Sequence, residues 1–384
     1  MNSPRTARPE ELPAIIDLAE HVFADLEKRP RFLERLFPLF LSPANADNLH
    51  VITADVGRPV ALLGTSPETF VTAGCEIPCG LIGGVCAHEN HRGHGYSGLL
   101  LDAAYRRLRE RGAVLAWISG DRSVYVKSGA EPVWPLFRGV FDGAVPLQAL
   151  GDRATDIVRA TPADIPTVVA LHDQEPARFL WRPQWLDVVL PHLMTPDLNA
   201  IYLIRRTGRT VAAACLRGRS QTRLFQPGAT ADMLDWFGDR AALLAALGRI
   251  ASDAQLAKLS WLFTSDERQI LDGLRVAGFT IDAVRTHTWT LKVLDFPGLL
   301  QRVQPHLRRV LGNEASRITA TESGWCVRRQ ATDYVTPDEQ MAARILFSRP
   351  EDYAARWAEV PDDVRELFGR VFPLPLRHYG LNYI

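Results

Sequence analysis

The sequence predicts an α/β (α+β) protein with two mixed-sheet domains, the second a degenerate copy of the first, followed by a small α+β domain. Three observations predict this class. Strand-like apolar runs alternate with segments of helical periodicity. The pattern that opens the chain returns near residue 157, and it changes again from about residue 289. The predicted domains are residues 1–150, 151–288 and 289–384.

Length and composition fit a globular protein without a charge bias. The 384 residues exceed one ordinary core, and 44 Lys+Arg balance 44 Asp+Glu. This balance gives no general attraction to nucleic acid or to an anionic membrane. No apolar run approaches the roughly 20 residues that span a bilayer, and the first residues lack the apolar core of a signal peptide. We therefore expect a cytoplasmic protein without nucleic-acid or membrane partners, and a homo-oligomer stays open.

The cysteines predict neither a disulfide framework nor a metal site. Their number is odd and they are scattered, which is untypical of a disulfide scaffold. The first two are close together, but no second Cys/His pair stands at zinc-ligand spacing. We expect no bound metal. The five residues are Cys75, Cys79, Cys86, Cys215 and Cys326.

The first domain opens with two expected helices and then four strands. The first helix begins at residues 9–13, where prolines and acids mark a helix start, and runs to Phe23. The second is expected at residues 30–40. Such a mixed sheet flanked by helices binds ligands where its strands splay. The strands are expected at residues 49–54, 59–65, 70–73 and 81–87.

The stretch 85–101 joins a strand, a turn and a helix. The turn holds Arg92, Gly93 and Gly95, and apolar residues at helical spacing follow it. The first N–H groups of a helix have no intrahelical partner and lie at the positive end of its dipole. Glycines let a phosphate approach these groups closely, and an arginine suits a pyrophosphate. The sequence therefore predicts an anion site at this turn.

The turn resembles the coenzyme A pyrophosphate loop of the GNAT acetyltransferases, Arg/Gln-x-x-Gly-x-Gly/Ala. Arg92 and Gly95 match, and Ser97 stands where the family has glycine or alanine. The turn lacks the Lys-Ser/Thr of a P-loop, and its glycines do not fit the dinucleotide fingerprint. An ordinary strand-to-helix turn with polar surface side chains is the alternative.

A second match follows this helix. The strand-like run 113–118 precedes a short helix that carries Tyr125 and ends near Gly129 and Ala130. The segment resembles the Tyr-x-x-x-Gly-Phe segment of GNAT enzymes, with Ala130 in place of phenylalanine. The resemblance implies that Tyr125 lies near the coenzyme A sulfur and protonates the leaving thiolate. The alternative is a packed tyrosine with a bonded hydroxyl.

The second domain repeats the first with drift. Residues 158–166 are similar to residues 6–13, and residues 259–263 are similar to 115–118. We interpret this similarity as an internal duplication, with chance likeness of two helix starts as the alternative.

The second copy has lost the chemistry of the first. Its counterpart of the turn is residues 236–241, where one glycine remains and Asp239 would repel a pyrophosphate. Leu274 stands where the first copy has Tyr125. We therefore expect coenzyme A to bind the first domain only.

The third domain is expected to mix short strands with helices. A strand is expected at 290–295, and a helix from Asp295 to about Val310. The chain closes on an apolar segment that would not normally be left in water. Two more strands are expected at 318–321 and 325–328, and further helices at 337–347, 351–358 and 362–368.

An active GNAT copy, a degenerate copy and an α+β tail are together similar to the enhanced-intracellular-survival (Eis-like) acetyltransferases, whose tail folds like a sterol carrier protein. The alternative family is that of the mycothiol-synthase-like tandem GNAT proteins, but these proteins lack such a tail. The resemblance implies an N-acetyltransferase. Its acyl donor would be acetyl-CoA, and its acceptor a small-molecule or peptide primary amine.

The resemblance also assigns roles to residues. Tyr125 is the expected general acid. Residues 77–88 offer no Asp or Glu as a base, and the resembling family uses the carboxylate at its own C-terminus, which here belongs to Ile384. His88 or a water chain is the alternative base. The residues expected to bind acetyl-CoA are Val85, Cys86, Ala87, Arg92, Gly93, His94, Gly95, Tyr96 and Ser97.

Two alternatives concern the turn and the function. His88, His91 and His94 have the spacing of a metal trio, but a turn does not hold them on one helix face, so we expect solvated side chains. The competing function is a non-catalytic module that binds coenzyme A, or a lipid through the tail. Release of free thiol from acetyl-CoA with a panel of amines separates the two functions.

Overall fold

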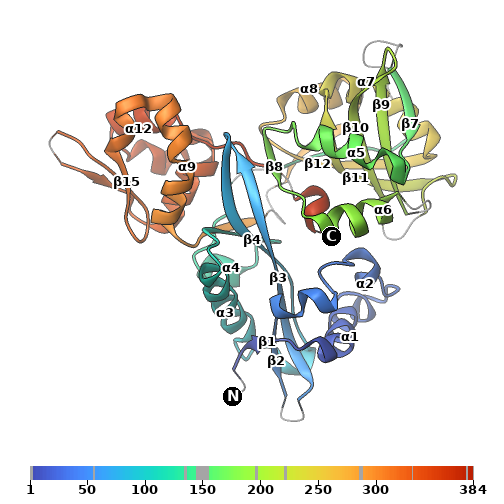
Figure 1. The fold of residues 1–384 in the computed structure, drawn as a ribbon, viewed down its shortest axis with the longest axis horizontal. Coiled ribbons are helices and arrows are strands. Elements are labelled where there is room, and N and C mark those ends of the chain that lie inside the picture. The colour runs from blue at the N-terminus through green and yellow to red at the C-terminus, as the bar shows by residue number, and fades with distance from the viewer. Residues whose placement is uncertain are drawn as a thin grey trace. The chain divides into compact units, whose positions relative to one another are not determined.

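The computed structural model describes residues 3–54, 57–133, 136–143, 155–194, 198–219, 223–284, 289–330, 332–377 and 379–383. The chain forms two compact units (Figure 1). The first unit comprises Met1–Trp134, Thr286–Pro375 and Tyr383–Ile384, and the second comprises Pro135–Arg285 and Leu376–Asn382.

The first unit is built on a mixed sheet with strand order β1-β2-β3-β4-β5-β14. All neighbours are antiparallel except β4 and β5, which are parallel and joined through a helix. The expected strands 59–65 and 70–73 form one continuous strand, because β4 pairs with β3 along its whole length. The strands are β1 (Arg5–Thr6), β2 (Leu49–Thr53), β3 (Pro59–Thr72), β4 (Cys75–Ala87), β5 (Leu115–Ile118) and β14 (Thr290–Val293).

Helices cover both faces of this sheet (Figure 1). On one face lie α1 (Leu12–Phe23) and α2 (Leu33–Leu36), with the 3-10 turns η1 (Pro9–Glu11), η2 (Asp25–Glu27) and η3 (Pro43–Asn48). On the other lie α3 (Tyr96–Glu110) and α4 (Ser123–Lys127), and η4 (Glu89–His91) precedes α3. Each face has its own apolar core, with Ile15 and Leu18 in one and Leu100 and Ala104 in the other.

The helix expected at residues 30–40 is reduced to the single turn of α2. The carboxylate of Glu20 accepts the N–H groups of Phe32 and Leu33, at 3.0 and 2.6 Å, and so caps the start of this turn. Pro38 follows directly and disfavours helical geometry at Phe37. The aromatic residues beyond it therefore lie in irregular chain rather than on one helical face.

The second unit repeats the plan of the first. Its sheet has the order β13-β6-β12-β11-β10-β9-β7, and β11 and β12 are again a parallel pair joined through a helix. The strands of this sheet are β6 (Leu136–Phe141), β7 (Thr155–Arg159), β9 (Asn199–Arg206), β10 (Arg209–Gly218), β11 (Ala229–Gly238), β12 (Leu256–Thr264) and β13 (Thr280–Val284), and the short strand β8 (Ala177–Phe179) is not part of it. Its helices are η5 (Pro162–Asp164), α5 (Ile165–His172), the π-helix η6 (Trp185–Val189), α6 (Leu190–Leu193), α7 (Arg240–Asp253) and α8 (Arg268–Val276). Two mixed sheets confirm the predicted fold class.

Each sheet includes one strand that follows the other sequence repeat along the chain. Strand β6 follows the first copy along the chain, yet it pairs with β12 and β13. Strand β14 follows the second copy, yet it pairs antiparallel with β5. The boundaries predicted near residues 150 and 288 fall outside the described residues, and the contiguous ranges 1–150, 151–288 and 289–384 stay a prediction.

The rest of the first unit is a small α+β arrangement near the C-terminus, as predicted; its likeness to a sterol carrier protein stays a prediction. Ion pairs join it to the first sheet: Lys292 Nζ lies 2.7 Å from Glu339, and Arg344 Nε donates to Glu131 at 2.7 Å. Its three-stranded antiparallel sheet is β15 (Ile318–Ala320), β16 (Trp325–Val327) and β17 (Tyr334–Val335). Its helices are α9 (Phe296–Leu311), η8 (Gly312–Arg317), α10 (Glu339–Phe347), η9 (Pro350–Tyr353), α11 (Ala354–Ala358) and α12 (Asp362–Gly369). Among the described helices, none has the length and apolarity needed to cross a membrane.

Candidate active site

Strands β4 and β5 separate at the C-terminal part of β4. Their parallel pairing stops at Ile82 and Ile118, and the N–H of Ser119 makes the last contact, to the carbonyl of Ile82 at 3.1 Å. Strand β4 continues for five more residues, to Ala87. In the described chain, residues 83–87 thus have a strand partner on one side only. An open strand edge of this kind can take up an extended ligand.

A bulge in β4 sets which groups face this opening. Gly84 and Val85 stand opposite one residue of β3, and Gly84 has the left-handed φ of 62° that glycine adopts without strain. Beyond the bulge, the N–H of His88 donates to Val60 at 2.9 Å. Hydrogen-bonded pairs alternate along an antiparallel ladder, so Cys86 also faces β3.

The neighbours of Cys86 consequently face the opening. The carbonyl of Val85 accepts from Arg122 Nη1 at 3.5 Å, and that of Ala87 accepts from Arg92 Nε at 3.4 Å. In an extended residue the N–H and the carbonyl face the same side of the strand, so we infer that the N–H groups of Val85 and Ala87 face the opening as well. Of the predicted group 85–87, these two residues have backbone donors directed at the open edge. Burial raises the pKa of the Cys86 thiol to about 12, so the thiol stays protonated.

The turn after η4 presents a row of backbone donors. Gly93 and Gly95 have φ values of 82° and 75°, and Gly95 is the N-terminal cap of α3. A Cβ at either glycine would meet nothing within 4 Å, so open space lies beside both. Among the described residues, the N–H groups of residues 93–97 donate to no protein acceptor. Together with the positive end of α3, they suit a pyrophosphate.

Side chains at this turn hold its shape and add charge. His94 Nδ1 lies 3.0 Å from the Arg92 carbonyl and 3.2 Å from that of His91, and its ring stacks on Tyr96. The exposed guanidinium of Arg92 is within reach of an anion at the turn. His94 therefore shapes the loop, whereas Arg92 supplies a positive charge.

Replacing Arg92 with alanine is expected to raise the dissociation constant of coenzyme A about tenfold, because an exposed charged contact to the pyrophosphate is lost. Isothermal titration calorimetry measures this change. Arg106→Ala is the matched control, since Arg106 is an exposed arginine of α3, the helix that follows the turn, and lies away from the turn. Equal weakening in both variants would show that only net charge matters and would contradict a specific contact.

Tyr125 lies on α4, on the other side of the opening. Its side chain is only 2% exposed and belongs to the core beneath α3. Ser128 Oγ donates to the Tyr125 carbonyl at 2.7 Å and bonds the Tyr105 hydroxyl at 2.8 Å. These two bonds connect the end of α4 to α3, which carries Tyr105. Within the described residues, the Tyr125 hydroxyl makes no hydrogen bond to the protein. Its proton is therefore not engaged by any residue that the structure describes.

The surroundings keep this phenol protonated. Burial raises the pKa of Tyr125 above its ordinary value; Arg122 opposes this shift and Cys86 adds to it. At neutral pH the side chain thus holds a proton that it can give to a developing anion. A raised pKa also disfavours the phenolate form of Tyr125.

Tyr125 closes one end of a cavity of about 320 Å³. The cavity runs from the β4 bulge toward α1 and α2, and its walls are largely apolar. Its lining residues are Ala19, Phe23, Glu27, Arg29, Phe32, Leu33, Leu36, Phe37, Phe40, Leu41, Leu62, Gly84, Val85, Ser119, Arg122 and Tyr125. Sequence reasoning did not assign the aromatic residues of this wall to a site; their density over residues 23–40 was the available signal.

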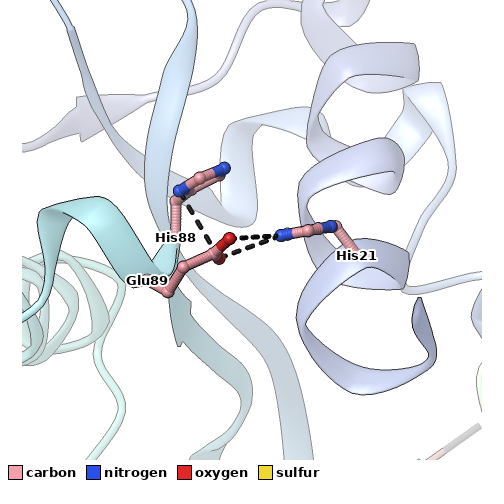
Figure 2. A group of neighbouring side chains, drawn as sticks. All are labelled: His21, His88 and Glu89. Carbon is pink, nitrogen blue, oxygen red and sulfur yellow. Dashed lines mark hydrogen bonds and ion pairs between the residues drawn. The ribbon is translucent and has the colours of Figure 1, made fainter. Parts of the chain in front are cut away.

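The histidines of the turn do not gather as a trio. His88 Nδ1 accepts the N–H of Asn90 at 3.3 Å, and His94 bonds carbonyls of the turn instead. His88 joins His21 of α1 around the Glu89 carboxylate, as Figure 2 shows. Glu89 lies 2.9 Å from His21 Nε2 and 3.5 Å from His88 Nδ1. These contacts tie α1 to the segment that leads into the turn.

The C-terminal segment is anchored in the second unit. Arg377 is buried and bonds Glu175 and Asp235, each at 2.7 Å, and its guanidinium also donates to the carbonyl of Trp236. The N–H of Leu381 donates to Asp235 at 3.1 Å. Ile384, the predicted source of the base, lies outside the described residues.

In the described residues of the second unit, no open turn joins the corresponding strand and helix. Strand β11 passes into α7 through Asp239 alone, whose side chain caps the helix by accepting from Ala242 at 3.0 Å. Arg240 is held by Glu175 and Glu267 at 2.8 and 2.7 Å. Leu274, at the place of Tyr125, is fully buried. This structure gives physical reasons for the predicted loss of coenzyme A binding in the second copy, which itself stays a prediction.

Strand β4, the turn at residues 93–97 and Tyr125 all lie in the part of the chain that matches a known family. Residues 3–133 match the family model described as acetyltransferase (GNAT) domain. Residues 3–133 thus form an acetyltransferase (GNAT) domain, and members of this family use an acyl-CoA donor. No curated protein matches the chain.

Solved structures share the fold over nearly the full chain. A probable N-acyltransferase of Enterococcus faecalis has a TM-score of 0.71 at 14% identity, covering 98% of each chain. A GCN5-related N-acetyltransferase of Kribbella flavida has a TM-score of 0.64 at 16% identity, covering 98% of this chain and 97% of that one. Eis1 of Mycobacterium abscessus has a TM-score of 0.62 at 12% identity, covering 99% of each chain. The predicted Eis-like architecture is confirmed at the level of fold.

Proposed function

We propose that the protein is an N-acetyltransferase that moves an acetyl group from acetyl-CoA to a primary amine. The observation that carries the proposal is the convergence of three features on the end of β4. These features are the row of N–H groups at residues 93–97, the open edge at Val85 and Ala87, and the cavity that ends at Tyr125. The first suits a pyrophosphate, the second an extended thioester and the third an amine.

The chemistry is direct attack of the neutral amine on the thioester carbonyl. A carbon–nitrogen bond forms, and negative charge develops on the carbonyl oxygen, where the N–H groups of Val85 and Ala87 would stabilise it. The carbon–sulfur bond then breaks, and the Tyr125 hydroxyl gives its proton to the departing thiolate. The amine loses one proton to a base, and this proton balances the one that Tyr125 supplied. The products are an amide and free coenzyme A.

The base in this proposal is the carboxylate of Ile384. Strand β4 offers no Asp or Glu between Ile77 and His88, so a carboxylate must come from elsewhere. The residues that precede it are held in place, because the buried Arg377 pairs with Glu175 and Asp235 and the N–H of Leu381 donates to Asp235. An apolar environment would raise the pKa of an α-carboxylate and make it a better base.

The proposal also keeps the expected location and partners. We propose a cytoplasmic enzyme whose partner is a small-molecule or peptide amine, with neither nucleic acid nor a membrane involved. The formal net charge of zero supports the absence of a polyanionic partner.

Amine-dependent release of free thiol from acetyl-CoA tests the function. The enzyme is incubated with acetyl-CoA and a panel of primary amines, and a thiol reagent measures coenzyme A. Release that depends on the amine and saturates is the expected result. Binding of acetyl-CoA without release, with every amine, would contradict the proposal and support a non-catalytic module.

A further inference from the structure

The cavity beside Tyr125 has the chemistry of a site for a small aromatic amine. At about 320 Å³ it lies at the small end of ligand pockets. Most of its lining side chains are apolar, and four are phenylalanines that are partly exposed to the cavity: Phe23, Phe32, Phe37 and Phe40. Partly exposed aromatic rings in a concave site offer contact area to a ligand ring.

One of these rings is placed by two glycines of the sheet. A Cβ at Gly64 would overlap the ring of Phe40, and a Cβ at Gly84 would lie 3.2 Å from it. The ring therefore lies directly on the β4 bulge, next to the open strand edge. Phe37 stands beside it, with ring centroids 6.2 Å apart and planes tilted by 60°. The two rings form an aromatic wall close to the place where the thioester would react.

The charges of the cavity disfavour an acceptor with several ammonium groups. Its only carboxylate among the described lining residues is Glu27, which is paired with Arg29 at 2.9 Å. The remaining charged group is Arg122, a cation. Among the described lining residues, a second ammonium group would thus meet apolar surroundings and a guanidinium but no unpaired carboxylate, and the proposed Ile384 carboxylate would already face the reacting amine. A single amine loses its proton more easily in such surroundings, which favours attack.

We propose that the acceptor is an arylalkyl primary amine with one amino group, whose ring packs against Phe37 and Phe40 while its nitrogen points at the β4 bulge. The inference rests on the proposed acetyl transfer and names the substrate class of that site. An acyl chain longer than acetyl could in principle fill the same apolar space, and the experiment separates this occupant from the amine.

The experiment measures kcat/KM for 2-phenylethylamine and for spermidine with acetyl-CoA as donor, in the wild type, in Phe37→Ala and in Leu26→Ala. Leu26 is an exposed apolar residue of η2 that does not line the cavity, so its variant is the matched control. We expect the wild type to prefer 2-phenylethylamine at least tenfold. Phe37→Ala should lower kcat/KM for this amine roughly tenfold by raising its KM, while the KM of acetyl-CoA stays unchanged. Phe37→Leu keeps most of the apolar volume and serves as a second variant in case Phe37→Ala does not fold. Its melting temperature is compared with that of the wild type.

Each outcome bears on a different statement. A preference for spermidine would overturn the substrate class while leaving acetyl transfer intact. A Phe37→Ala variant with unchanged kinetics toward the aryl amine would overturn the inference, and an altered kcat/KM of the same variant for hexanoyl-CoA, offered as donor in a parallel assay, would assign the cavity to the acyl chain. Thiol release that is the same with and without an amine would contradict the proposed function itself. The inference about the substrate class would then fall with it.

Discussion

Replacing Tyr125 with phenylalanine is expected to lower kcat by roughly 10²-fold or more, the range for loss of a general acid. The affinity for acetyl-CoA should change little, because the hydroxyl acts only when charge develops on the thiolate. The substitution removes one oxygen from a side chain that is 2% exposed and whose hydroxyl bonds none of the described residues. The fold should therefore tolerate it. Steady-state kinetics, together with calorimetric titration of coenzyme A, measure both quantities.

The control for this change is Tyr105→Phe. Tyr105 is also buried in the first unit, and its hydroxyl bonds Ser128 on the segment that carries Tyr125. This variant loses a phenolic hydroxyl in the same core without touching the cavity. It should keep turnover within a few-fold of the wild type. If Tyr125→Phe turned over at the wild-type rate in single-turnover experiments, Tyr125 would be a packing residue and another acid would be needed.

Adding a few residues after Ile384 is expected to lower turnover by roughly 10²–10⁴-fold, as for a lost general base. The extension converts the terminal carboxylate into a peptide bond and leaves the rest of the chain unchanged. The anchor at Arg377, with its partners Glu175 and Asp235, lies upstream of the change. The melting temperature and the affinity for coenzyme A should therefore stay close to those of the wild type.

The same residues added before Met1 provide the control, which should be fully active. Since the terminal carboxylate is the only group removed, the pH dependence of kcat/KM should also lose its acidic limb in the extended enzyme. An extended enzyme with wild-type turnover and pH profile would end the proposal. His88, which lies at the end of β4 beside Glu89, would then be the next residue to test.

The elements that the sequence predicted best are those whose determining residues are neighbours in the sequence. The turn at Arg92 and Gly95 could be predicted because its glycines and the following helix are contiguous, and the structure places them as a strand, turn and helix. The short helix carrying Tyr125 was predictable for the same reason. Local backbone chemistry is sufficient for such motifs.

Pairing between distant segments was beyond the reach of sequence periodicity. Strands β6 and β14 each complete a sheet whose other strands lie elsewhere along the chain, and periodicity shows that a strand exists but not its partner. The aromatic wall was missed for a related reason. The contact of Phe40 with Gly64 and Gly84 joins three distant positions, and only their meeting in space makes a cavity. The prediction of two separate strands, 59–65 and 70–73, was wrong because the polar residues in the middle of β3 resemble a turn. In the structure these residues pair with β4.

The most direct test of the account follows the acetyl group itself. The enzyme is given acetyl-CoA with an isotopic label in the acetyl group together with 2-phenylethylamine, and mass spectrometry quantifies the amide while a thiol reagent quantifies coenzyme A. The account predicts one equivalent of labelled N-acetyl amide for each equivalent of coenzyme A released, and neither product above background with Tyr125→Phe on the same time scale. Coenzyme A release without labelled amide, with this or any other primary amine, would contradict it.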